Sequence, residues 1–120
     1  MRCALRALAA AALALLAPAA AAHAFLDHAS PRVGSTVGAA PAEVKVWFTQ
    51  ELEPAFSTLR VLDHDGRQVD RRDKQVDPSD RTVMRVSLPP LPAGSYRVQW
   101  RALSVDTHVT DGDFTFVVAP

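Results

Sequence analysis

"SYRVQWRALSVDTHVTDGDFTFVV", from Ser95 to Val118, decides the fold of this chain. Its two ends, residues 95–103 and 113–118, are short runs rich in aromatic and β-branched residues, which predicts two strands. Phe114 and Phe116 lie two positions apart and therefore share one face of the second strand. A polar middle segment separates the two strands, so the stretch is typical of an all-β protein.

Three further strands are predicted before this stretch, because apolar and polar residues alternate at 43–48, 57–63 and 82–88. Turn signals lie between them. "DHDG" ends at Gly66, which can adopt a positive φ, and "PPLPAG" at 89–94 contains prolines that cannot donate to a strand ladder. These interruptions keep each strand short.

The polar stretch "RQVDRRDKQVDPSDR", residues 67–81, is predicted to be an exposed excursion between strands. With another run around Phe25 and Leu26, about seven short strands are expected. Their spacing is typical of a sandwich or Greek-key barrel. We therefore expect an all-β fold, a single immunoglobulin-like Greek-key β-barrel or sandwich. Trp47 and Trp100 are expected to pack in its core or on a sheet face.

Residues 1–22 have the layout of a secretory signal peptide: two arginines, an apolar run of Ala and Leu, then small residues. The apolar run is shorter than the roughly 20 residues that span a bilayer, and no later segment is apolar enough. We therefore expect an exported chain with no membrane insertion after processing. Cleavage after Ala22 leaves His23 first, whereas cleavage after Ala24 leaves Phe25. The first is favoured, because the second puts a histidine between the two small residues.

Composition limits the functions open to the processed chain. Residues 23–120 are enough for one small domain. The single cysteine, Cys3, lies in the signal peptide, so the domain depends on its hydrophobic core and not on a disulfide. The full chain has 13 Lys and Arg against 13 Asp and Glu, and this balance argues against nucleic acid or an anionic membrane as a partner.

The polar middle segment of the opening stretch carries the chemistry. Asp106 and His108 are two residues apart and project to the same side if the segment is extended. If His23 is the first residue, its α-amine and its Nδ1 atom close a six-membered chelate ring around one metal ion. Three nitrogen donors and one carboxylate suit tetragonal Cu(II), although zinc accepts the same donors in a tetrahedron.

The other histidines are weaker candidates. His64 lies in a predicted turn and is expected to be exposed, and His28 is either a neighbour of the site or an ordinary strand residue. Neither a Ser-His-Asp order nor a catalytic cysteine is present in the processed chain. An Asp-Thr-His triplet also occurs at surface turns without any metal, so the terminal histidine is what favours metal binding.

Three motifs in order resemble the CopC family of exported copper-binding proteins. "HAFLDHASP" begins at His23, "FTQE" at Phe48 to Glu51 stands where the family has F-S-E-P, and "SVDTHVTDG" matches S-x-D-x-H-x-x-x-G. The last motif falls on Ser104, Asp106, His108 and Gly112. The resemblance extends over essentially the whole of residues 23–120.

This resemblance implies a seven-stranded periplasmic domain that binds one Cu(II) ion. The ligands that it implies are the terminal amine and imidazole of His23, the imidazole of His108 and the carboxylate of Asp106. Some family members add a Glu from F-S-E-P, where this chain has Gln50 followed by Glu51. Gln50 is expected to hydrogen-bond a ligand or a water, and Glu51 to face the other way on an extended strand.

The terminal histidine, the Asp-Thr-His triplet and the absence of a second catalytic group favour a non-catalytic copper(II) carrier or buffer in copper homeostasis and resistance, and we expect a monomer. The resemblance suggests an inner-membrane copper transporter of the CopD type as the recipient. Two alternatives remain. One is a copper-brace redox enzyme like the lytic polysaccharide monooxygenases, and the other is a metal-independent immunoglobulin-like interaction module. Because only Met84 remains after processing, inside a predicted strand, no Met-rich Cu(I) site is expected.

Overall fold

The computed structural model describes residues 23–120, and the predicted signal peptide lies outside these residues. The described chain forms eight strands and one short 3-10 turn, η1. Their bounds are β1 (Leu26–Ser30), β2 (Thr36–Val37), β3 (Glu43–Phe48), η1 (Pro54–Phe56), β4 (Thr58–Leu62), β5 (Gln75–Val76), β6 (Val83–Ser87), β7 (Gly94–Leu103) and β8 (Val109–Val118). No helix in this part of the chain is long and apolar enough to cross a membrane.

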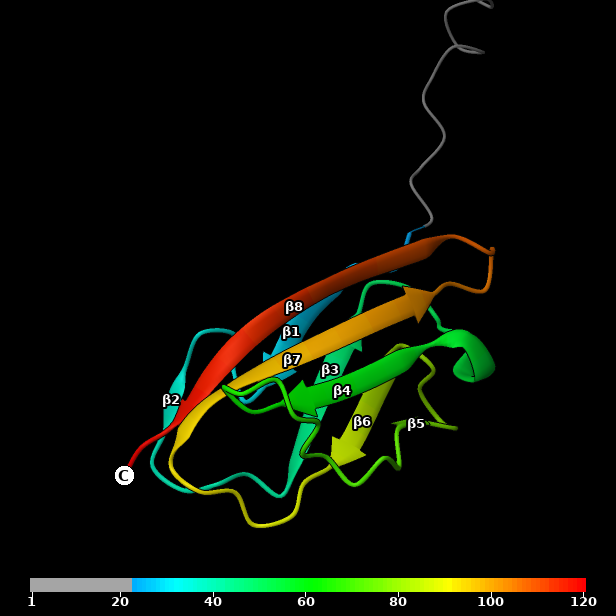
Figure 1. Ribbon diagram of the computed structural model, residues 1–120. Coiled ribbons are helices and arrows are strands. Elements are labelled where there is room, and N and C mark those ends of the chain that lie inside the picture. Colours follow the sequence, from blue (N-terminus) through cyan, green and yellow to red (C-terminus); the bar gives the residue numbers. More distant parts are fainter. Residues whose placement is uncertain (1–22) are drawn as a thin grey trace, which may run out of the picture.

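The strands form two four-stranded sheets (Figure 1). One sheet has the order β1-β3-β6-β5 and the other has the order β2-β8-β7-β4. All pairs are antiparallel except β2 with β8. Because the chain passes repeatedly from one sheet to the other, β3 pairs with β6 and β4 with β7, far along the sequence. This arrangement confirms the expected all-β immunoglobulin-like sandwich.

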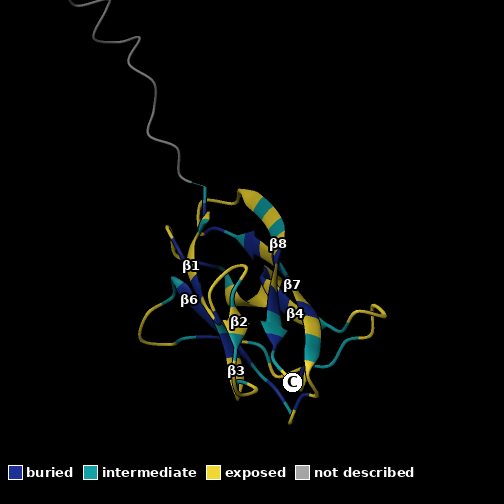
Figure 2. Ribbon diagram, turned by 90° about the vertical axis from the view of Figure 1, so that its left-hand side faces the viewer, coloured by how far each residue is buried: buried dark blue, intermediate teal, exposed yellow. Residues whose placement is uncertain are grey.

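The core lies between the two sheets and is built from alternate residues of each strand (Figure 2). In β3 the side chains of Val44, Val46 and Phe48 are buried, whereas Lys45 and Trp47 are on the outer face. This alternation confirms the predicted faces, because successive side chains of a strand point to opposite sides of its sheet. Other buried side chains include Leu52, Leu59, Val61, Met84, Val86, Tyr96, Val98, Trp100, Phe114 and Phe116.

The prediction of an exposed excursion at 67–81 is wrong in part. This segment contains β5, and both Asp70 and Val76 are 7% exposed. The Asp70 carboxylate accepts hydrogen bonds from the backbone N–H groups of Val61 and Arg72, both at 2.8 Å. The segment therefore covers the outer edge of β4 and satisfies backbone groups that an exposed edge would leave to water.

The long hairpin of β7 and β8 positions the candidate site. Ten residue pairs join the two strands, from Gly94 with Val118 to Leu103 with Val109. The second strand therefore begins at Val109, four residues earlier than the sequence pattern predicts, because ladder pairing continues through polar residues. Figure 1 shows both strands running to the end of the sandwich where the chain enters β1. The loop that closes this hairpin is residues 104–108.

Candidate metal centre

The hairpin loop at 104–108 is a tight turn and not an extended segment, which corrects the sequence-based assumption about Asp106 and His108. The Thr107 N–H donates to the Ser104 carbonyl at 2.9 Å, and the Ser104 N–H donates to the His108 carbonyl at 3.0 Å. Thr107 has φ of 74°, in the left-handed region that L-residues rarely occupy. The turn nevertheless places the Asp106 and His108 side chains next to each other.

Ser104 organises the Asp106 carboxylate. Ser104 is 1% exposed, and its hydroxyl donates to Oδ1 of Asp106 while it accepts from the His108 N–H at 3.3 Å. The other carboxylate oxygen, Oδ2, lies 3.4 Å from Nδ1 of His108. The Ser104 hydrogen bond, and after it the His108 ring, lowers the pKa of Asp106 below its ordinary value. The carboxylate is therefore ionised, as a metal ligand must be.

His23 reaches this loop from the other end of the described chain. Its imidazole stacks on the His108 imidazole, with ring centroids 4.4 Å apart and an interplanar angle of 21°. Phe25 packs near the same ring, with centroids 5.9 Å apart. The structure thus brings His23, His108 and Asp106 together, which are the three candidate ligands that the sequence indicated.

The connection between β3 and β4 contacts the hairpin loop through backbone hydrogen bonds. The Val105 N–H donates to the Glu51 carbonyl at 3.1 Å, and Leu52, which is fully buried, forms a β-bridge with Ser104. Gln50 and Glu51 are both exposed, and Glu51 meets the loop through its backbone. Sequence reasoning missed the role of the Ser104 hydroxyl. The Ser-x-Asp spacing was the available signal, because serine hydroxyls commonly bond within such turns.

The remaining candidate residues have other partners. The His28 ring stacks on Trp47 with centroids 4.2 Å apart, and its Nδ1 lies 2.6 Å from an Asp27 carboxylate oxygen, so its described contacts do not include the three candidate ligands. The His64 side chain is 75% exposed in its turn, as predicted. Trp100 is buried and meets Phe48 edge to face, which confirms a packing role.

An open groove of about 620 Å³ lies elsewhere, over β4, β7 and β8. Arg60, Arg101 and Asp111 are among the residues that line it, and none of the three candidate ligands does. This groove is therefore separate from the candidate site at the hairpin loop.

The imidazole nitrogens of His23 and His108 and the carboxylate of Asp106 are donor types that a metal ion accepts. In this structure, however, they do not surround one point. Among residues 23–120, no three His, Cys, Asp or Glu side chains stand as a complete metal-binding group. The two imidazoles lie face to face, so their nitrogen atoms do not converge on one point. The side chains of His108 and Asp106 are 54% and 34% exposed, so rotation about their side-chain bonds is open to them.

These features define a class: a small β-sandwich with two imidazoles and an ionised carboxylate gathered at the end of its long hairpin. Residues 26–119 match the CopC domain family. The chain belongs to the CopC family. The matched range begins at Leu26 and so leaves His23 just outside it.

Solved structures and relatives agree with this membership. CopC from Methylosinus trichosporium OB3b is 36% identical, with a TM-score of 0.77 over 82% of this chain and 95% of that one. PcoC from Escherichia coli, described as a methionine-rich copper resistance protein, is 36% identical, with a TM-score of 0.69 over 81% of this chain and 99% of that one. The copper transport protein CutJ of Bacillus subtilis is 32% identical over 81% of this chain, which spans only 18% of CutJ.

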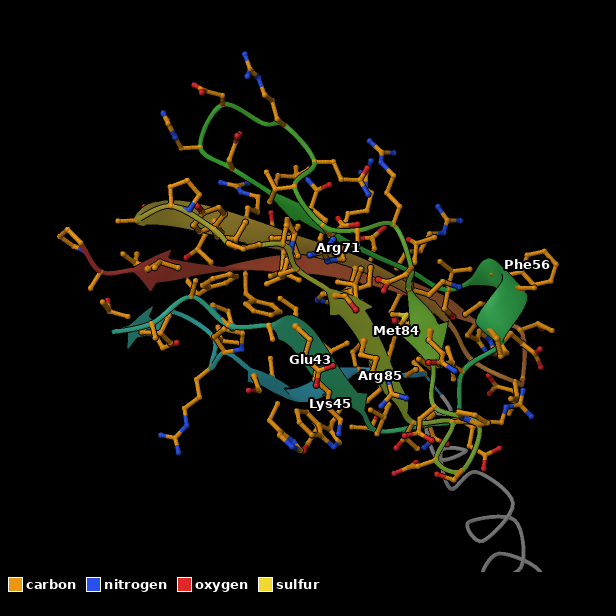
Figure 3. All side chains as sticks on the ribbon, turned by 90° about the horizontal axis from the view of Figure 1, so that it is seen from below. Glu43, Lys45, Phe56, Arg71, Met84 and Arg85 are labelled. Carbon is orange, nitrogen blue, oxygen red and sulfur yellow. The ribbon has the colours of Figure 1, made fainter. Side chains whose placement is uncertain are left out.

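This chain has few methionines, unlike the relative that is described as methionine-rich. It has two methionines in all, and Met84 lies within β6 with 0% of its surface exposed. In Figure 3 the Met84 side chain is on the body of the sandwich, whereas Phe56 projects from η1 at one end. The Met84 sulfur is therefore part of the core.

Proposed function

We propose that this chain is a periplasmic copper(II) carrier or buffer in copper homeostasis and resistance, with one Cu(II) ion as its cargo. A copper-related resistance role follows from membership of the CopC family. The proposed ligands are the α-amine and imidazole of His23, the imidazole of His108 and the carboxylate of Asp106. The observation that carries the proposal is the His23 ring stacked on the His108 ring, with Asp106 Oδ2 3.4 Å from His108 Nδ1.

The burial of Ala24 supports cleavage of the signal peptide after Ala22. Ala24 is 0% exposed within the core cluster, and its carbonyl accepts a hydrogen bond from the Thr110 hydroxyl. Cleavage after Ala24 would remove this buried residue together with His23. Cleavage after Ala22 retains both, and it creates an α-amine on the residue whose ring already lies against His108.

The donor chemistry supports Cu(II) as the cargo. An amine and an imidazole on one residue chelate with a small bite angle, which suits the near-90° angles of a tetragonal site. The ionised Asp106 carboxylate adds a hard, negatively charged donor that stabilises the cupric state. This stabilisation also argues against the copper-brace oxygenase alternative, because that chemistry requires ready reduction to Cu(I).

We further propose that the processed chain acts as a monomer and that its recipient is an inner-membrane copper transporter of the CopD type. The support for the recipient is the match to CutJ, a copper transport protein in which a segment like this chain makes up 18% of the length. A domain of this kind therefore occurs within a protein named for copper transport.

Cu(II) titration of the exported, processed protein tests the site. We expect about one tight equivalent in the wild-type protein and its loss in His23→Ala and in His108→Ala. His64→Ala is the matched control, because its exposed ring lies in a distant turn, and it should bind as the wild-type protein does. Mass spectrometry of the exported form reads the terminus directly. Unchanged affinity in both site variants, or a mature chain that begins at Phe25, would overturn the proposal.

Ascorbate-driven peroxide turnover on polysaccharides separates the carrier from the oxygenase alternative. We expect no turnover above that of free copper. The metal-independent interaction module predicts instead that copper leaves the thermal stability of the processed protein unchanged.

A further inference from the structure

Two threonine hydroxyls, one from each sheet, hold the backbone of residues 23–25. The Thr49 hydroxyl accepts from the Phe25 N–H at 3.0 Å and donates to the His23 carbonyl at 3.3 Å. The Thr49 N–H also donates to the Phe25 carbonyl at 2.9 Å. From the opposite sheet, the Thr110 hydroxyl donates to the carbonyl of Ala24.

These two threonines come from different sheets. Thr49 directly follows β3, and Thr110 is the second residue of β8, two positions after His108. The segment therefore bridges the two sheets at the end of the sandwich, with Ala24 fully buried between them. Its backbone direction delivers the His23 ring onto His108, because the carbonyl and N–H groups on either side of Ala24 are fixed.

This arrangement solves a problem that a terminal ligand poses. A free chain end would lose its backbone freedom when it wraps a metal ion, and fixing one residue costs about as much as a tenfold change in binding constant. A backbone segment that is already held in place loses little further freedom on binding, so only the side chains of His23, His108 and Asp106 have to rearrange around the metal ion.

We propose that Thr49 and Thr110 are positioning residues that hold residue 23 ready for copper. The inference rests on the proposed function, since it assigns the two hydroxyls a role at the same centre. Neither hydroxyl is a ligand. Each acts through the backbone of the segment 23–25, and their combined effect is on affinity and not on the identity of the donors.

Thr49→Val and Thr110→Val test the inference, because valine keeps the shape of threonine and removes only the hydroxyl. In the processed protein, each variant should bind Cu(II) about five- to tenfold more weakly in competition with a chelator, and the double variant more weakly still. The electron paramagnetic resonance spectrum of bound Cu(II) should stay that of the wild-type protein. Thr49→Ser and Thr110→Ser retain the hydroxyl and should restore the affinity.

Two further measurements separate positioning from general stability. Thr115→Val is the matched control on β8, since this exposed residue lies far from the segment, and its Cu(II) affinity should match the wild-type value. In the metal-free protein, amide exchange of the Phe25 N–H should accelerate in Thr49→Val while the exchange of β7 amides stays unchanged.

The outcomes distinguish this inference from the proposed function. If His23→Ala and His108→Ala lose copper while both valine variants bind as the wild-type protein does, the positioning role is refuted and the site stands. If the wild-type processed protein binds no copper, the site itself fails. Valine variants that melt earlier but keep full affinity below their melting temperature would also refute the positioning role.

Discussion

Replacement of Gly112 by alanine tests why the Ser-x-Asp-x-His motif of this chain ends in a glycine. A Cβ atom at Gly112 would lie 2.6 Å from Cζ2 and 2.9 Å from Cε2 of Trp100. Movement of the indole is restricted, because Trp100 is 9% exposed and its ring meets Phe48 at 5.2 Å and 71°. The glycine is therefore a packing requirement of the hairpin that carries the loop.

The size of the effect follows from this overlap. Ordinary van der Waals contact of a Cβ begins at 3.4 Å, so the indole or the strand must shift by roughly 0.8 Å. Overpacking of this kind costs about 1–3 kcal/mol in the free energy of unfolding. A domain of this size loses about 4–8 °C of melting temperature per kcal/mol, so Gly112→Ala should melt roughly 4–24 °C below the wild-type protein.

Thermal unfolding of the metal-free processed protein, followed by circular dichroism, is the assay. Gly38→Ala is the control, because a Cβ there meets nothing within 4 Å, and its stability should change by less than about 0.5 kcal/mol. Combining Gly112→Ala with Trp100→Phe completes a double-mutant cycle, in which the smaller ring should relieve part of the cost. The reasoning is refuted if Gly112→Ala melts with the Gly38 control or if the cycle shows no coupling.

Three further predictions concern the buried carboxylate, the loop and the metal. Asp70→Ala should lower the free energy of unfolding in urea by about 1–3 kcal/mol, because the Val61 N–H loses its buried acceptor; an unchanged midpoint would contradict this. Ser104→Ala should raise the pKa of Asp106, measured by carboxyl NMR titration. Because that pKa is lowered on folding, Asp106 contributes stability above pH 3.8 that is lost as the pH falls through its folded pKa. The variant should lose the part of this acid dependence that the Ser104 hydroxyl causes, while the part due to His108 remains. Cu(II) at a hundred times its dissociation constant should stabilise the processed protein by about 2.7 kcal/mol and leave His108→Ala unaffected; equal melting temperatures with and without copper would count against the proposed centre.

Much of the fold was predictable because alternation in a strand is a local property. The faces of β3, β4 and β8 follow from residue types two positions apart, and Val46, Val61 and Phe116 are buried as the pattern indicated. The strands β2 and β5 have two residues each, too few to show a period, so neither was predicted from the sequence pattern.

The sequence indicated which residues to consider for the candidate site, and it did not indicate how they are arranged. Spacing identified Asp106 and His108, and the terminal position identified His23. The assumed extended conformation was wrong, since Thr107 takes a left-handed φ of 74° and the loop closes on the Ser104 hydroxyl. The sequence gives no clear sign that Thr107 adopts a left-handed φ. The ten residue pairs between β7 and β8 close the hairpin at this loop, and this closure imposes the conformation.

The sequence by itself determined which side chains each strand buries and which residue types were available as ligands, because both depend on neighbours within a few positions. Only the tertiary structure decided that β3 lies beside β6, that Asp70 covers the edge of β4, and that the His23 ring comes to rest on His108. These contacts join residues far apart along the chain. They form only when the buried faces of the two sheets pack together, and a sequence pattern of a few residues does not predict which distant segments pack together.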